Sequence, residues 1–269
     1  MAESGLLVSL AQIAAVVALV FPLVMYLAQD SLIFHPQRLP EARRVAIAQR
    51  SASIESVFID AADGTRLHAW HLRGAPGSPL VIYFGGNAEE VSWMLDDAAR
   101  RTPQVGWLLV DYRGYGASGG SPSEAALAGD ALQWYDHVAK GQKSVYVFGR
   151  SLGGGVAVQL AAARPVAGVV LVAPFDSLVE VGKHYYPYLP VNWMLRHRFD
   201  SVTLAPKITA PLLCIVAARD EIIPAERSKR LYDTWGGPKR WVGLEGASHN
   251  STDDHANYWP SIVAFLSGK

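Results

Sequence analysis

The sequence contains little charge and almost no cysteine. Its 24 basic residues balance its 24 acidic residues, so the net charge is zero and no basic surface for nucleic acid is expected. Charged residues make up 18 % of the chain, below the roughly 25 % of typical globular domains, which indicates that some apolar residues lie in lipid. The single cysteine, Cys214, excludes an internal disulfide and a thiolate metal cluster.

A long uncharged run occupies residues 6–28. As a helix it would span roughly 35 Å, enough to cross the hydrocarbon core of a bilayer. Tyr26 suits the headgroup level, and no small-residue cleavage site of a signal peptide is present, so residues 1–30 are predicted to be a permanent transmembrane anchor. The alternative is a buried helix of the soluble domain. Because Arg38, Arg43 and Arg44 follow the run, the positive-inside tendency predicts a single-pass membrane protein with its main domain in the cytoplasm.

No internal repeat or low-complexity linker divides the rest of the chain, so residues 31–269 are predicted to form one domain. A polar connector at residues 37–50 is followed by two extended stretches at 54–60 and 65–72. Asp63-Gly64 lies between these stretches, and this dipeptide favours a hairpin turn. The domain is therefore expected to begin with an antiparallel pair of strands.

Short apolar runs then alternate with segments compatible with helices. The predicted strands are 80–84, 107–110, 145–148, 168–172, 212–216 and 241–244, and the predicted helices are 89–101, 123–139, 152–163, 225–234 and 258–266. This alternation predicts an α/β fold with a mostly parallel sheet of about eight strands, flanked by helices. Ligands of such sheets bind at the carboxyl ends of the strands, so the residues directly after each run are the candidates for function.

The sequence Gly149-Arg150-Ser151-Leu152-Gly153 stands between a predicted strand and a predicted helix. This G-x-S-x-G pattern is typical of a sharp turn that raises a serine hydroxyl above the sheet. The flanking glycines leave room for close backbone, and the helix N-terminus provides positive potential for a developing oxyanion. Arg150, inside the turn, either contacts a substrate carboxylate or braces the turn.

A serine hydroxyl needs a base, and the base needs a carboxylate to orient it. Asp220 follows the strand predicted at 212–216, and His249 follows the one at 241–244, so both lie at the same sheet edge as Ser151. These residues occur in the chain order serine, acid, histidine. Asp176, after the run at 168–172, is the competing acid. The predicted catalytic residues are Ser151, Asp220 and His249.

Two further segments belong to the predicted site. Gly85-Gly86-Asn87 follows the first parallel strand, and the backbone N–H groups of Asn87 and Leu152 are predicted to form an oxyanion hole, although a plain turn would also explain the glycines. Residues 177–205 are predicted to form a short helical cap. Aromatic residues in it, including Tyr185 and Tyr186, either line an acyl pocket or form an ordinary packed cover.

Several sequence segments resemble those of one known family. These segments are 83–88, 111–116, 118–124, 149–153, 173–175 and 248–250. In this order they are similar to the α/β-hydrolase superfamily, and within it to the membrane-anchored group with a serine-aminopeptidase-like domain that includes protein depalmitoylases. That group usually has histidine where this chain has Gly85. The resemblance implies the α/β-hydrolase fold and hydrolysis of an ester or thioester.

The predicted function is a serine hydrolase that cleaves carboxylic esters or thioesters through an acyl-enzyme, with Gly85, Gly86, Arg150, Tyr185 and Tyr186 as substrate contacts. This chemistry requires no metal and no organic cofactor. The expected partner is a small or lipid-like acyl substrate, or an acylated protein, and not nucleic acid. The alternatives are an aminopeptidase-like peptidase and a non-catalytic, membrane-tethered binding module.

Overall fold

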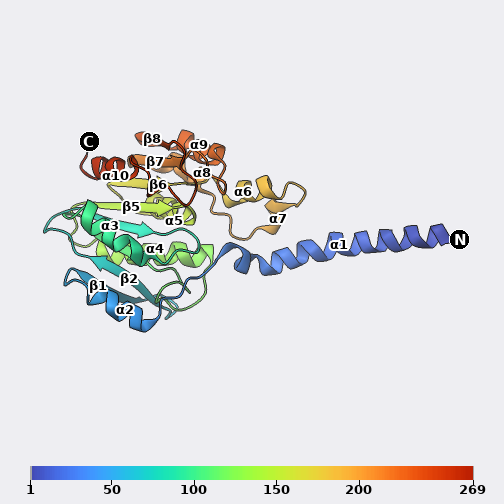
Figure 1. The fold of residues 1–269 in the computed structure, drawn as a ribbon, viewed down its shortest axis with the longest axis horizontal. Helices are drawn as coiled ribbons and strands as arrows, with labels where there is room; N and C mark the ends of the chain where they lie inside the picture. The colour runs from blue at the N-terminus through green and yellow to red at the C-terminus, as the bar shows by residue number, and fades with distance from the viewer. Residues whose placement is uncertain (1, 269) are drawn as a thin grey trace.

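The computed structural model describes residues 2–268, without the side chains of residues 2–11, 13–15 and 17–19. Its first element, α1 (Ala2–Ile33), is a long helix that projects away from the rest of the chain (Figure 1). Apolar side chains near its C-terminal end, such as those of Val24 and Leu27, are exposed. Among the described residues, no helix has the length and apolarity needed to traverse a membrane. Much of the run at 6–28 lies outside the described side chains.

A single sheet forms the centre of the domain. In the described part of the chain it has eight strands, in the order β1-β2-β4-β3-β5-β6-β7-β8. The strands are β1 (Ile54–Asp60), β2 (Arg66–Leu72), β3 (Leu80–Phe84), β4 (Gly106–Val110), β5 (Val145–Arg150), β6 (Gly168–Val172), β7 (Leu212–Ala217) and β8 (Lys239–Leu244). β2 pairs antiparallel with both β1 and β4, and every other pair is parallel. The predicted hairpin and the mostly parallel sheet are therefore confirmed.

Helices cover both faces of this sheet (Figure 1). One apolar cluster joins the sheet to α4 (Glu124–Val138), α5 (Leu152–Ala163) and α9 (Ala225–Thr234). A second cluster joins the opposite face to α2 (Glu41–Ala48), α3 (Met94–Arg101) and α10 (Tyr258–Leu266). Neighbouring strand residues alternate between the clusters, as Ile82 and Tyr83 do, because successive side chains of a strand point to opposite faces.

Two expected segments differ from the structure. The connector predicted at 37–50 contains α2, which follows Pro40 and buries Ile47 against the domain. Its high polar content hid this helix, although proline just before a first turn that contains Glu41 is a helix-start signal. The helix predicted at 89–101 begins later, because Glu89 and Glu90 lie in a loop before the short helix η1 (Val91–Trp93) and α3.

The predicted cap lies between β6 and β7. It consists of α6 (Leu178–Tyr185), α7 (Val191–Met194), α8 (Ser201–Leu204) and η2 (Ala205–Lys207). In Figure 1, α6 and α7 lie beside the C-terminal end of α1. The cap, the N-terminal helix and the carboxyl edge of the sheet therefore share one end of the molecule.

Candidate active site

Ser151 occupies a strained turn between β5 and α5. Its backbone has φ 50° and ψ −115°, a conformation that a non-glycine residue rarely adopts. The turn is crowded, since a Cβ on Gly153 would lie 2.0 Å from the Phe84 carbonyl oxygen and one on Gly149 would lie 2.3 Å from the Gly153 carbonyl oxygen. Only glycine fits at these two positions. The Ser151 N–H donates to the Val172 carbonyl at 2.9 Å, which fixes the turn to the end of β6.

The structure brings Ser151, His249 and Asp220 into one chain of hydrogen bonds. His249 Nε2 lies 3.0 Å from Ser151 Oγ. On the other side of the ring, His249 Nδ1 lies 2.8 Å and 3.0 Å from the two carboxylate oxygens of Asp220. The carboxylate also accepts the backbone N–H groups of Ile222 and Ile223 at 2.9 Å and 2.7 Å. An Nδ1–H held by Asp220 leaves Nε2 free to take a proton from Ser151.

Asp176, the competing acid, lies in a different environment. Its buried carboxylate pairs with Arg227 at 3.1 Å and accepts the Ser177 N–H at 2.8 Å. Burial raises the pKa of Asp176, and the Ser177 amide and Arg227 oppose that rise. Asp220, and not Asp176, contacts His249.

The loop after β3 lies against the serine turn. A Cβ on Gly86 would be 3.7 Å from Ser151 Cβ, so the backbone here passes close to the Ser151 side chain. The side chain of Asn87 is fixed on both sides: Nδ2 donates to the Ile33 carbonyl at 2.6 Å, and Oδ1 accepts from Tyr115 Oη at 2.8 Å. Leu152 begins α5, so its N–H is one of the unpaired donors of a helix N-terminus.

Glu89, which is not among the predicted site residues, forms an ion pair with Arg150, and the two side chains are only 7 % and 12 % exposed. Glu89 Oε2 accepts from Arg150 at 3.2 Å and from the Gly86 N–H at 2.6 Å. Its other oxygen accepts from Tyr83 Oη at 2.6 Å and Trp93 Nε1 at 3.0 Å. Burial is the largest single effect and lowers the pKa of Arg150, but Glu89 together with Tyr83 and Tyr258 raises it by more, so the net pKa is raised. The guanidinium therefore stays charged.

Arg150 also reaches the histidine loop. Its second terminal nitrogen donates to the His249 carbonyl at 3.2 Å and to Asn250 Oδ1 at 3.4 Å. The side chain thus joins the serine turn, the loop after β3 and the loop after β8. Of the two roles considered for Arg150, these contacts favour bracing over binding a substrate carboxylate. The signal that could have identified Glu89 is its position three residues after Gly86, in the loop that follows a predicted strand.

The remaining predicted substrate contacts lie at two places. Gly85 is part of the loop after β3, where its carbonyl accepts the hydroxyl of Tyr112 at 2.8 Å. Tyr185 ends α6, Tyr186 follows it, and both are about half exposed. The Tyr185 hydroxyl donates to the carbonyls of Glu221 and Ile222 at 2.9 Å and 3.0 Å, so the cap is attached to the loop that holds Asp220.

A second set of serine, histidine and aspartate lies elsewhere in the domain. Ser56 Oγ is 2.9 Å from His68 Nε2, and His68 Nδ1 is 2.7 Å from Asp111 Oδ2. Ser56 lies within strand β1 and has neither a strained turn nor a helix N-terminus beside it. His68 and Asp111 are fully buried and join β2 to the end of β4. These contacts hold strands together, and Ser56 therefore provides a comparison for Ser151: it has similar hydrogen-bond partners but lacks the strained turn and the helix N-terminus.

A family model described as "Serine aminopeptidase, S33" matches residues 77–199. An uncharacterized protein of Mycobacterium tuberculosis is 39 % identical over 236 residues, which cover 84 % of this chain and 82 % of that protein. An uncharacterized membrane protein of Saccharomyces cerevisiae is 29 % identical over 229 residues, with 81 % of each chain covered.

Two further proteins in the comparisons carry functional names. The lysophosphatidylserine lipase ABHD12 of Danio rerio is 35 % identical over 188 residues, which cover 61 % of this chain and 49 % of the lipase. The solved structure of an esterase from Exiguobacterium antarcticum superposes with a TM-score of 0.60 at 20 % identity, covering 79 % of this chain and 100 % of the esterase. At that identity the superposition establishes the fold alone.

Proposed function

This chain belongs to the α/β-hydrolase superfamily, and we propose that it is a serine hydrolase that cleaves carboxylic esters or thioesters through an acyl-enzyme. One observation carries the proposal: the hydrogen bonds that join Asp220, His249 and Ser151 at a strained turn. The lipase among the relatives supports a lipid-like acyl substrate, and an acylated protein is the other substrate we propose.

In the proposed reaction, Ser151 Oγ attacks the carbonyl carbon while His249 Nε2 takes the hydroxyl proton. The tetrahedral oxyanion accepts the N–H groups of Asn87 and Leu152, a type of contact that commonly contributes about 3 kcal/mol to transition-state stabilisation. His249 then protonates the leaving alcohol or thiol, and the acyl group stays on Ser151. Water attacks the acyl carbon in the second half, with His249 taking the proton of the water and returning it to Ser151.

A fluorophosphonate probe tests the nucleophile, because it phosphonylates only an activated serine. We expect labelling of the wild-type protein and of Ser56→Ala, and no labelling of Ser151→Ala. Ser56 is a matched control because it also lies within hydrogen-bond distance of a histidine that contacts an aspartate. Labelling of Ser151→Ala, or of none of the three proteins, would refute the proposal. Activity on aminoacyl anilides with none on esters would favour the peptidase alternative.

We also propose that α1 anchors the domain in a membrane, with the domain on the cytoplasmic side. The uncharged run at 6–28, the exposed apolar side chains of Val20, Leu23 and Val24, and the membrane relative from yeast support this proposal. We expect the full-length chain to remain with membranes after an alkaline carbonate wash. In right-side-out vesicles the domain should resist added protease. Release by carbonate would refute the anchor, and cleavage in intact vesicles would refute the orientation.

A further inference from the structure

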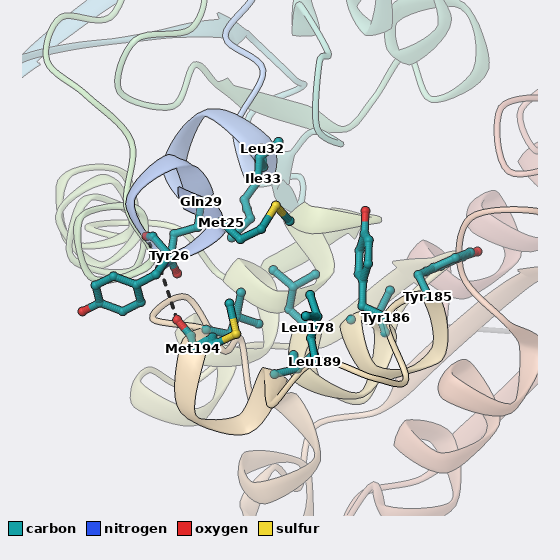
Figure 2. Close-up of a pocket in the computed structure, with 14 residues that line it drawn as sticks. Met25, Tyr26, Gln29, Leu32, Ile33, Leu178, Tyr185, Tyr186, Leu189 and Met194 are labelled. Atoms are coloured by element: carbon teal, nitrogen blue, oxygen red, sulfur yellow. Dashed lines mark hydrogen bonds between the residues drawn. The ribbon is translucent and has the colours of Figure 1, made fainter. Parts of the chain in front are cut away.

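An apolar groove lies where α1 meets the cap. It has a volume of about 270 Å³, close to the lower end of the range for small-molecule sites, which is roughly 300–1,000 Å³. Met25 and Leu32 of α1 form one wall, and Leu178, Leu189 and Met194 of the cap form the other (Figure 2). Every described side chain that lines the groove is uncharged. A ligand that fits it is therefore apolar along most of its length.

The α1 wall is fixed to the cap by polar contacts. The buried side chain of Gln29 donates to the Met194 carbonyl at 3.2 Å and accepts the Arg196 N–H at 2.7 Å. The next residue, Asp30, accepts from Arg196 at 2.9 Å and contacts His197 Nε2 at 2.7 Å. The last turns of α1 are therefore part of the domain surface and not only a tether to it.

Both walls are attached to loops of the catalytic site. On the cap side, the hydroxyl of Tyr185 binds the carbonyls of Glu221 and Ile222, directly after Asp220. On the α1 side, the Ile33 carbonyl accepts Asn87 Nδ2 at 2.6 Å, in the loop beside Ser151. Two residues that line the groove, Tyr185 and Ile33, are thus hydrogen-bonded to the loop that carries Asp220 and to the loop that carries Asn87.

The outer surface around the groove is apolar and aromatic. On the cap, Tyr188 and Trp193 are 97 % and 89 % exposed. Exposed aromatic rings beside an apolar helix are typical of the interface between membrane and water. An acyl chain that leaves a bilayer would meet these two rings of the cap first and the groove next.

We infer that the groove binds the acyl chain of a membrane-lipid ester, so that the last turns of α1 form one wall of the substrate site. This inference rests on the proposed function: the ester carbonyl would lie at Ser151 while the chain occupies the groove. A peptide is a poorer fit because the lining offers few hydrogen-bond partners for a peptide backbone. The helix that anchors the protein would therefore also select the length of the chain it cleaves.

The test compares hydrolysis of p-nitrophenyl butyrate and p-nitrophenyl dodecanoate by the full-length protein in non-ionic detergent micelles. Met25→Trp and Leu189→Trp each fill the groove, from opposite walls, and Leu27→Trp places the same ring on the outer face of α1. One methylene in an apolar pocket changes kcat/KM by roughly tenfold or more. We expect the ratio of dodecanoate to butyrate kcat/KM to fall at least roughly tenfold in both groove variants and to stay at the wild-type value in Leu27→Trp.

The two esters separate the inference from the proposed function. If the wild-type protein hydrolyses butyrate but both groove variants keep the wild-type ratio, the groove inference is wrong and the proposed function stands. If Leu27→Trp lowers the ratio as much as the groove variants do, the effect comes from the helix surface and the inference is again wrong. If the wild-type protein hydrolyses neither ester, the proposed function fails and the inference fails with it.

Discussion

Replacing Arg150 by methionine tests whether the buried pair with Glu89 positions the catalytic loops. The substitution removes the 3.2 Å bond to Glu89 and the 3.2 Å bond to the His249 carbonyl, and it keeps an unbranched apolar stem. The Glu89 side chain is only 7 % exposed, so its carboxylate would stay buried without a cation. Breaking a buried pair in this way typically destabilises a protein by about 3–5 kcal/mol.

The contacts that remain reduce this figure. Glu89 would still accept three neutral donors, from Gly86, Tyr83 and Trp93, at 2.6–3.0 Å. Hydrogen bonds to a charged group contribute about 1.5–3 kcal/mol each, so they compensate part of the lost pairing. We expect Arg150→Met to lower the free energy of unfolding by about 2–3 kcal/mol, measured by urea denaturation with tryptophan fluorescence.

The same variant separates positioning from substrate binding. Loss of the bond to the His249 carbonyl frees the histidine loop, and a displacement of about 1 Å at a catalytic group costs on the order of 100-fold in rate. Because Asp220 still holds the ring, we expect kcat for a butyrate ester to fall roughly tenfold with little change in KM. A rise in KM with kcat unchanged would instead identify Arg150 as a substrate contact.

Arg164→Met is the matched control. Arg164 makes two 2.8 Å bonds to Asp136 on the surface, where solvent screens the pair. We expect its urea midpoint and kcat to match those of the wild-type protein. If Arg150→Met unfolds at the wild-type urea concentration and retains the wild-type kcat, the pair does not hold the site together.

Three further predictions follow from individual contacts. Asp220→Asn should lower kcat by about 10⁴-fold, because it presents the wrong tautomer to Ser151, whereas Asp176→Asn should keep most of the activity; equal losses would contradict the assignment of the acid. Gly153→Ala should cost at least about 3 kcal/mol in urea unfolding, since its Cβ would meet the Phe84 carbonyl, while Gly129→Ala, in open space on α4, should not destabilise. Burial raises the pKa of Tyr115 to about 12, above the 10 of an exposed tyrosine, so the folded state keeps a proton that the unfolded chain loses. Stability should therefore fall between pH 10 and 12, and less steeply in Tyr115→Phe; identical alkaline titrations would contradict this.

Much of the fold could be predicted from local patterns. The strands β3 and β6 have the predicted bounds, because a short continuous apolar run is typical of a strand buried on both faces. The convergence of Ser151, Asp220 and His249 followed from a general rule, since the carboxyl ends of parallel strands meet at one sheet edge. Helix α2 was missed because its one buried residue, Ile47, leaves a weak apolar pattern.

The features that were not predicted depend on contacts between distant segments. Glu89 acquires its role from Arg150, and the bond that joins α1 to the cap connects Gln29 with Met194, 165 residues apart. A single glutamate in a loop, or a glutamine near the end of an apolar helix, carries no pattern that names its partner. Only the folded chain brings these residues together.

The central claim is that Ser151 carries the acyl group during turnover. Rapid quenching of the wild-type protein with p-nitrophenyl butyrate, followed by proteolysis and mass spectrometry, measures this adduct directly. We predict a butyryl group on the peptide that contains Ser151, formed with a burst of p-nitrophenol and absent from Ser151→Ala. Steady hydrolysis with no acylated peptide, or with the acyl group on another residue, would contradict the acyl-enzyme mechanism.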